Sequence, residues 1–328
     1  MRSSFQRLVT SFLVIAFVSM PAFSQSIPAT YPTKPIKLIV PTAAGGGYDN
    51  IGRLLAEKLA TELGNSWVVE NRTGAGTVVG TQAATRAPAD GYTLLVGGLA
   101  NIAFNPGLYE KLPYNPSTDL VPIALVGSFS YTLVGNKDLA QTSLRELIDF
   151  AKANPGKLTI AHGGVGTGQH VAAALLKSLA KIDMVEVPYK GSQAAYTDLL
   201  GGRVDLFFDN TTTVRPFVDS ARAKAIVTSS SAREALLPQV PTGQEAGLQG
   251  LVLESWIGLF APANTPPAVV EKLRTAVANV MQNTDIRKRL EASGVRTFSM
   301  NARDTERFVK SETDKWTQFL RQAGIKAE

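Results

Sequence analysis

The hydrophobic pattern of the chain changes repeatedly between the period of a strand and the period of a helix. Residues 36–40 form a short β-branched run that predicts a buried strand, and residues 51–63 place their apolar side chains on one helical face. A glycine-rich loop at 43–47 joins the two, and Asp49 is typical of a helix N-cap. Residues 67–70 are strand-like again. This order of strand, loop, helix and strand is the unit of a parallel sheet.

The same order recurs along the rest of the chain. We predict helices over 76–87, 144–154, 169–180, 194–200, 266–283, 284–293 and 305–323. We predict further strands over 92–97, 158–161, 185–187, 204–208 and 223–228. The pattern therefore predicts an α/β fold built on parallel sheets.

Two glycine-rich strand–loop–helix units, near residues 45 and 166, lie far apart in the sequence, which predicts one unit in each of two lobes. Between them, strand-like runs at 123–126 and 131–134 are separated by a predicted break, and residues 251–260 are strand-like once more. One crossing out and one crossing back is what a hinge between two lobes requires. We predict lobe one over residues 26–127 plus 251–328 and lobe two over residues 128–250.

The N-terminus has the form of a secretory signal peptide over residues 1–24. Arg2 and Arg7 precede an apolar run at 8–18, and the predicted cleavage site follows Ser24. The run is shorter than the ~20 residues that a membrane span needs. The chain has no cysteine, so lipid attachment through an N-terminal cysteine is excluded. We therefore expect a soluble protein outside the cytoplasm, which the resemblance described below places in the periplasm.

Composition narrows the function. The 328 residues are 45% hydrophobic, which fits two globular domains. The net charge of +6 comes from scattered Lys and Arg, which argues against a nucleic-acid groove and suits attraction of anionic solutes. The absence of cysteine excludes thiolate zinc sites and cysteine nucleophiles.

Both glycine loops follow a predicted strand and open a predicted helix. Ligands of parallel sheets bind outside the carboxyl ends of strands, and a helix N-terminus offers unpaired N–H groups and a partial positive charge. Neither loop contains Lys or Arg. We therefore expect backbone amides to hold an anion there, with Thr42, Thr167 and His170 as nearby side-chain donors.

The motifs of several enzyme classes are missing or incomplete. Glycines at 74, 76 and 80 miss the dinucleotide-binding spacing by one residue, and neither a Walker motif nor a G-x-S-x-G elbow is present. His162 and His170 have no metal-binding spacing, and no serine stands at a strained turn beside them. We expect no cofactor, no metal and no catalytic residues, although residue types alone leave a Ser–His–Asp hydrolase open.

A series of short motifs runs in order along nearly the whole mature chain. They are Tyr31-Pro-x-Lys-Pro, Ala44-Gly-Gly-Gly-x-Asp49, Glu70-Asn-Arg-x-Gly-Ala-Gly76, Pro88-Ala-Asp-Gly-Tyr-Thr-Leu-Leu95, Asn105-Pro-x-Leu-Tyr109, Val187-Pro-Tyr-Lys-Gly191, Asp198-Leu-Leu-Gly-Gly-Arg-Val-Asp205, Leu237-Pro-x-Val-Pro-Thr242, Trp256-x-Gly-Leu-x-Ala-Pro262 and Ala323-Gly-Ile-Lys326. With these motifs the chain resembles the Bug-type solute receptors of tripartite tricarboxylate transporters. Each motif is unremarkable alone, but the whole series in this order is specific.

The resemblance implies a type II periplasmic binding fold whose two lobes close on a carboxylated ligand, and a two-component membrane transporter as partner of a monomeric receptor. Carried over by position, the first-lobe loop supplies Ala44, Gly45, Gly46, Gly47, Tyr48 and Asp49. The second-lobe loop supplies Gly166, Thr167, Gly168 and His170, and Asn101, Gly191 and Asp209 line the cleft.

Tyr48 is bulky where many relatives have a small polar residue. It could narrow the cleft or stack on an aromatic ligand, which leaves di- and tricarboxylates, acidic amino acids and aromatic carboxylates open as ligands. A receptor that signals through a sensor protein, and a periplasmic hydrolase or lyase, are the alternative functions.

Overall fold

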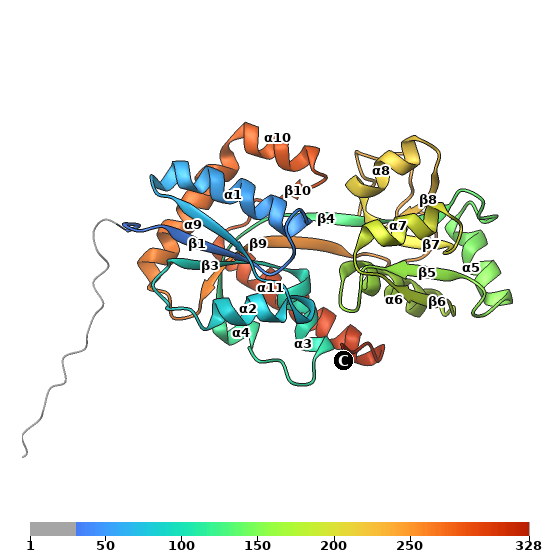
Figure 1. Cartoon of the computed structure of the whole chain (residues 1–328), viewed down its shortest axis with the longest axis horizontal. Helices are drawn as coiled ribbons and strands as arrows, with labels where there is room; N and C mark the ends of the chain where they lie inside the picture. Colours follow the sequence, from blue (N-terminus) through green and yellow to red (C-terminus); the bar gives the residue numbers. More distant parts are fainter. Residues whose placement is uncertain (1–30, 328) are drawn as a thin grey trace, which may run out of the picture.

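A ten-stranded sheet runs through the molecule, and strand β4 (Leu120–Asn136) belongs to both of its halves (Figure 1). The computed structural model describes residues 31–327, so the predicted signal peptide at 1–24 lies outside the described residues. Over these residues, helices long and apolar enough to cross a membrane are absent.

The first lobe contains a parallel sheet extended by antiparallel strands. Strands β2, β1 and β3 are parallel, β9 joins β3 antiparallel, and β9 then pairs with the first part of β4. The bounds are β1 Ile36–Val40, β2 Trp67–Asn71, β3 Thr93–Gly98, β9 Glu254–Pro262 and β10 Arg296–Thr297. The carboxyl ends of these parallel strands face the second lobe. Ligands of parallel sheets bind outside such strand ends, so this is where a ligand is expected.

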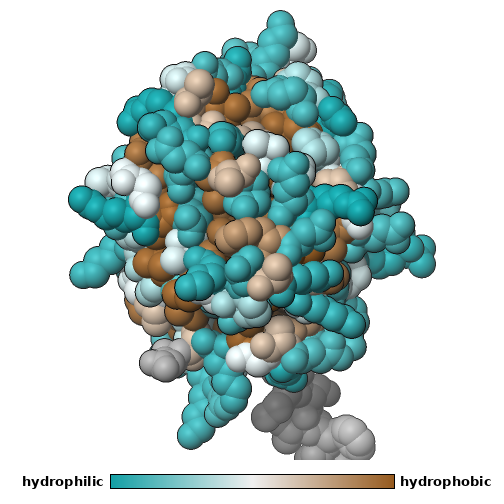
Figure 2. Space-filling model, turned by 90° about the vertical axis from the view of Figure 1, so that its right-hand side faces the viewer, coloured by the Kyte–Doolittle hydropathy of each residue, from teal (hydrophilic) through white to brown (hydrophobic). Residues whose placement is uncertain are grey.

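The second lobe repeats this plan around the last part of β4. Strands β7, β5 and β6 are parallel, while β4 pairs antiparallel with β7 and β8. The bounds are β5 Thr159–His162, β6 Val185–Pro188, β7 Leu206–Asn210 and β8 Ala223–Thr228. Figure 2, which faces the outer end of this lobe, shows apolar and polar side chains interleaved over its surface.

The chain crosses between the lobes within β4. Residues 120–130 pair with β9, and residues 131–136 pair with β7 and β8. The predicted break at 127–130 is wrong, because all four residues pair with β9. Gly127 belongs in the strand because the Arg296 carbonyl of β10 would lie only 2.5 Å from a Cβ there. Strand β9 runs back antiparallel beside this part of β4, and the lobe boundaries at 127/128 and 250/251 stay predictions.

Helices cover both faces of the sheets in each lobe (Figure 1). In lobe one they are α1 Gly47–Leu63, α2 Val78–Thr85, α3 Asn105–Leu108, α4 Pro116–Asp119, α9 Pro267–Gln282, α10 Thr284–Ala292 and α11 Ala302–Gln322, with a 3-10 turn η1 at Ala75–Thr77 and a π-helix η2 at Leu99–Phe104. In lobe two they are α5 Leu144–Ala153, α6 Gly168–Ala180, α7 Ser192–Leu200 and α8 Thr211–Asp219. The mixed α/β fold is the one expected from the sequence.

The pattern did not predict α8, η2 or the short helices α3 and α4. In α8, Pro216 interrupts a segment that reads as a loop, since proline inside a helix normally breaks it. Helix α11 packs its amphipathic face on η2 and α3, and Trp316 meets Phe104 edge-on at 5.3 Å between ring centroids. This contact supports one wall of the cleft described next.

Candidate functional site

A cavity of about 240 Å³ lies between the lobes, where the N-terminal ends of α1 and α6 face the same space. Seven of the predicted site residues line it: Thr42, Gly46, Gly47, Tyr48, Gly166, Thr167 and Gly168. The two glycine loops, far apart in sequence, therefore meet at one site.

The first wall is the loop between β1 and α1. Gly46 is the N-cap of α1 and has no side chain to satisfy the first helical amides, so these remain available to a ligand. Gly45 has a left-handed φ of +82°, which a side chain would disfavour. Both features suit a loop whose backbone approaches an anion closely.

Asp49 holds the first loop in place by hydrogen bonds. Its buried carboxylate accepts hydrogen bonds from the Gly45 amide at 2.8 Å, the Arg53 Nε at 3.0 Å and the Asn71 Nδ2 at 2.8 Å. Burial alone would raise the pKa of Asp49, but these hydrogen bonds outweigh it and hold the pKa below its ordinary value. The side chain is outside the cavity lining, so its place fits loop support better than ligand contact.

The second wall is the loop between β5 and α6. Thr167 is the N-cap of α6; its Oγ1 accepts from the His170 amide at 3.3 Å and donates to the Gly164 carbonyl at 2.7 Å. Its hydroxyl is thus engaged within the loop. Gly166 approaches Leu108 of lobe one so closely that a Cβ would lie 2.9 Å from that side chain. The two lobes are therefore in contact beside the cavity.

Aromatic side chains form the floor. Phe104, Phe129 and Tyr131 line the cavity with Tyr48, and Phe129 packs edge-to-face on Tyr131 with 6.0 Å between ring centroids. The Tyr48 hydroxyl accepts from the Ala100 amide at 3.2 Å. Burial raises the pKa values of Tyr48 and Tyr131, so both remain neutral phenols at physiological pH.

Two polar atoms in the lining are buried without a hydrogen-bond partner in the described chain. They are Thr42 Oγ1 of lobe one and Asn210 Oδ1 of lobe two. An unsatisfied buried polar atom costs about 1–3 kcal/mol. A polar ligand that reached both atoms would relieve this cost in both lobes at once.

Charged residues are absent from the described residues that line this cavity. Backbone amides and the N-terminal ends of α1 and α6 are therefore the groups that this lining can offer to an anion. This arrangement is the one expected from glycine loops without Lys or Arg.

Several predicted site residues do not line the cavity. Ala44 and Gly45 lie on the exposed part of the first loop. Asn101 is fully buried and holds the start of η2, because its Oδ1 accepts from the Gly98 amide at 2.9 Å and its Nδ2 donates to Thr81 at 3.0 Å. Gly191 is the N-cap of α7.

Asp209 also lies behind the lining. Its buried Oδ1 accepts from Gln169 Nε2 at 3.1 Å and from the Asn210 amide at 2.9 Å, and both partners line the cavity. Burial raises the pKa of Asp209. Its position fits support of these two neighbours.

His170 points away from the cavity. Its Nδ1 accepts from the Gly166 amide at 3.2 Å, and its Nε2 lies 3.2 Å from Glu186. Together with His162, these groups place three ligand-type atoms within 4.8 Å of one another. The arrangement does not suit a metal ion, because the Nδ1 atoms accept backbone N–H bonds, which puts the ring hydrogens on the Nε2 atoms that would have to coordinate. The Glu186 carboxylate is also paired with Lys177, whose Nζ lies 2.9 Å from Glu186 Oε1.

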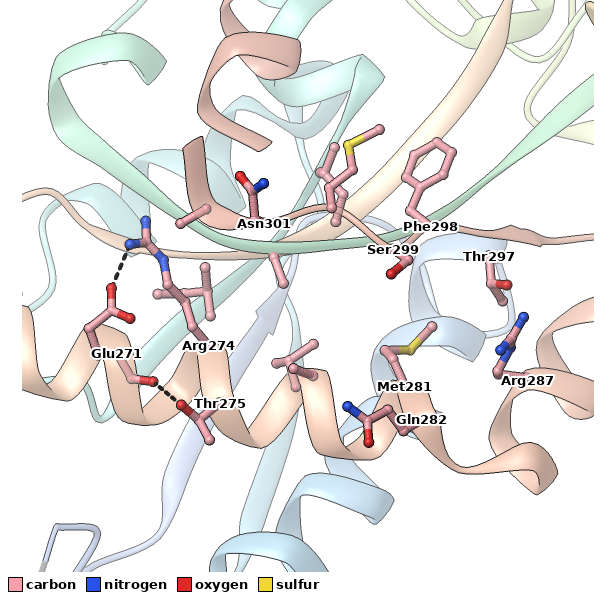
Figure 3. A pocket seen from close by; sticks show the side chains of 17 residues that line it. Glu271, Arg274, Thr275, Met281, Gln282, Arg287, Thr297, Phe298, Ser299 and Asn301 are labelled. Carbon is pink, nitrogen blue, oxygen red and sulfur yellow. Dashed lines mark hydrogen bonds and ion pairs between the residues drawn. The ribbon is translucent and has the colours of Figure 1, made fainter. Parts of the chain in front are cut away.

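A second cavity, of about 420 Å³, lies within lobe one between α9 and residues 297–302 (Figure 3). Its Arg274 is already paired with Glu271 at 2.7 Å and Glu306 at 2.9 Å. Neither glycine loop reaches it. We therefore place the candidate ligand site between the lobes.

Sequence reasoning missed the residues that complete the cavity. These are Gly76, Thr77, Ala100, Phe104, Phe129, Tyr131, Val165, Gln169, Asn210 and Ser255. Asn210 carried a usable signal, since it ends a parallel strand directly after the predicted Asp209. Phe129 and Tyr131 carried none, because they look like ordinary strand residues until β4 is placed across the lobes.

Comparisons with known proteins agree on one family. Residues 51–325 match the model of the tripartite tricarboxylate transporter family receptor. Protein BugT of Bordetella pertussis is 35% identical over 96% of this chain and 96% of its own. Two structures from Rhodopseudomonas palustris are similar: Rpa4515 with adipate (31% identity, TM-score 0.82, 90% of this chain and 99% of that one) and MatC with bound malate (32%, 0.79, 88% and 100%).

Proposed function

Because this chain belongs to the tripartite tricarboxylate transporter receptor family, whose members are transport receptors rather than enzymes, we propose that it captures a small carboxylate between its lobes and delivers it to a two-component membrane transporter. The observation that carries the proposal is the pair of helix N-termini that face one uncharged cavity from opposite lobes. Such ends bind anions without a cationic side chain. An anion held by both would stabilise the closed arrangement of the lobes.

The ligand proposed is a short aliphatic dicarboxylate. Adipate and malate, bound by the two similar receptors, are both of this kind. Thr42 offers a hydroxyl on one side, and the side-chain amide of Asn210 offers a polar group on the other. Tyr48 is only 7% exposed, which leaves little ring face for stacking on an aromatic acid. This favours the aliphatic alternative.

The proposal includes a cellular setting. A signal peptide at 1–24 directs the chain to the periplasm, where it diffuses as a monomer and meets its transporter. The similarity to solved structures of a periplasmic transporter and of the periplasmic binding protein BugD supports this setting.

A thermal-shift screen of the exported chain against adipate, malate, citrate, glutamate and benzoate tests the proposal, after unfolding and refolding to remove carried-over ligand. At a hundredfold excess over Kd, a ligand adds about 2.7 kcal/mol. For a chain of about 300 residues, whose entropy of unfolding is about 0.6 kcal/mol/K, that raises the melting temperature by about 4 °C. We expect a rise with an aliphatic dicarboxylate. A folded protein that responds to none of the acids would contradict the carboxylate proposal.

Two variants at one position separate charge from bulk. Gly46→Asp places a carboxylate at the N-terminus of α1 and should abolish the response by repelling the anion. Gly46→Asn adds a side chain of nearly the same shape without the charge, so it should retain part of the response. Equal responses of the two variants would show that the anion does not bind at this helix end.

A further inference from the structure

The chain contains only two histidines, and they occupy the two ends of the second-lobe loop. His162 is the last residue of β5, and His170 lies in the first turn of α6. Both are buried, and their rings stack with 4.5 Å between centroids and 29° between planes. The cleft loop at 163–167 is thus anchored on a histidine pair that does not itself line the cavity.

Each histidine accepts a backbone hydrogen bond from this loop. The Gly164 amide donates to His162 Nδ1 at 3.3 Å, and the Gly166 amide donates to His170 Nδ1 at 3.2 Å. Gly166 lines the cavity, and the Gly164 carbonyl receives the hydroxyl of Thr167, the N-cap of α6. The two Nδ1 atoms therefore help to set the shape of the second wall.

This role depends on the protonation state. A neutral imidazole has one donor and one acceptor nitrogen, whereas an imidazolium has two donors and no acceptor. Acceptance at Nδ1 places the hydrogen of each ring on Nε2. In His170, that nitrogen faces Glu186 Oε2 at 3.2 Å. A proton added at Nδ1 would oppose the glycine N–H and break the bond that holds the loop.

We infer that His162 and His170 are positioning residues for the ligand cleft, which shape its second wall only while both rings are neutral and release the loop as the pH falls. The inference rests on the proposed function in one respect: the loop is the ligand-binding wall. Such a device would make ligand capture sensitive to acid.

Charged side chains approach the histidine pair from two elements. Among residues 31–327, the charged side chains in contact with the pair or its partner are Glu186 of β6 and Lys177 of α6. The hydrogen bond from His170, with Lys177, lowers the pKa of Glu186 to about 2, so this carboxylate stays ionised. Burial, and then the neighbouring His170, lower the pKa of His162. Because the pKa of His162 is lowered on folding, its bond to the Gly164 amide is present at neutral pH and its contribution to stability is lost as the pH falls below the ordinary value of about 6.5.

Nitrogen NMR of the untagged chain tests the inference without any ligand. With two histidines, the imidazole ¹⁵N spectrum contains two residues. At pH 8 we expect both rings in the Nε2–H form. As the pH is lowered until the ¹⁵N shifts report a protonated ring, the glycine amide bonded to that ring (Gly164 for His162, Gly166 for His170) should exchange about tenfold faster than its intrinsic pH dependence predicts, since one net hydrogen bond is lost. The Gly45 amide, held by Asp49, is the internal control and should keep its protection. An Nδ1–H form of either ring at pH 8, or unchanged protection of Gly166 through the titration, would overturn the inference.

Variants add an independent arm. In His170→Asn, the side-chain oxygen takes the place of Nδ1 as an acceptor that does not titrate, so Gly166 should stay protected at both pH 8 and pH 5. In His170→Gln, the amide reaches the place of Nε2 and leaves Gly166 without its acceptor, so protection should be lost already at pH 8. Similar protection in both variants would contradict a role for Nδ1. If no carboxylate raises the melting temperature in the thermal-shift screen, the proposed function is refuted, but these spectra are unaffected. Failure of the proposed function can therefore be told apart from failure of the histidine inference.

Discussion

The two loops that form the cleft have the same task but are held in different ways. Both follow a parallel strand and open a helix toward the cavity. The first is held by Asp49, a carboxylate whose pKa lies below its ordinary value. The second is held by the Nδ1 atoms of His162 and His170. A carboxylate accepts hydrogen bonds throughout the physiological range, whereas an imidazole accepts only when neutral.

The difference teaches that the two walls of one cleft can respond differently to conditions. Near neutral pH both loops are held, and the cleft presents two helix ends. In mild acid the first wall is unchanged and the second loosens. Substitutions that act on one wall at a time can break or sharpen this comparison.

The largest difference should come from alanine at matched glycines. A Cβ at Gly168 would lie 1.9 Å from the Tyr131 hydroxyl, while at Gly46 the nearest atom would be 3.5 Å away. We expect Gly168→Ala to lower the free energy of unfolding by about 3 kcal/mol through overpacking, and Gly46→Ala by less than about 1 kcal/mol. Urea denaturation measures both. Equal losses would show that the second wall is not the more tightly packed of the two.

Removal of the charge at Asp49 tests how the first wall is held. Asp49→Asn turns one carboxylate oxygen into a donor that faces other donors, and we expect a loss of about 2 kcal/mol at pH 7, since hydrogen bonds to charged groups are worth about 1.5–3 kcal/mol. Because the pKa of Asp49 is lowered on folding, its contribution is present above about pH 4 and disappears below that value. Urea denaturation of both chains at pH 8, 5 and 3 should show a constant difference between pH 8 and 5 and a smaller one at pH 3. A difference that already shrinks at pH 5 would remove the contrast with the histidine loop.

The unpartnered atoms of the lining should affect binding rather than folding. Thr42→Val removes a buried hydroxyl that has no partner in the described chain, so stability should be unchanged or slightly higher. The affinity for the carboxylate that raises the melting temperature most in the screen should fall by about fivefold, equivalent to about 1 kcal/mol. Asn210→Ala tests the opposite lobe and should cost a similar amount of affinity, as calorimetry would show. A loss in one variant and none in the other would mean that the ligand engages only one lobe.

The sequence was sufficient for the parts of this site that depend on local chemistry. Glycine loops at strand ends, without Lys or Arg, predicted an anion site made of helix ends; both loops do meet at one cavity, and the anion itself stays a prediction. The long periodic segments predicted most helices and strands. Helix α8 was missed because Pro216 interrupts its pattern, and the break predicted between the two runs of β4 was wrong because Gly127 stays in the strand, where β10 approaches it closely.

What depended on long-range contact could not be predicted. Phe129 and Tyr131 enter the cavity only because β4 spans both lobes. The residue type of His170 was noticed, but its ring points into the lobe, and no pattern in the chain shows which nitrogen faces Gly166. Asn101 likewise holds η2 from a buried position that spacing cannot reveal.

The smallest effect should come from the hydroxyl of Tyr48. Tyr48→Phe leaves the Ala100 amide without the acceptor it has at 3.2 Å, so we expect a loss of about 1 kcal/mol in unfolding free energy. The aromatic ring stays in place, and an aliphatic dicarboxylate that does not stack on it should keep its affinity within about twofold. Thermal melts and calorimetry on the same protein separate the two effects. A large loss of affinity with unchanged stability would mean that the hydroxyl contacts the ligand, and the first wall would then bind through a side chain as well as through its helix end.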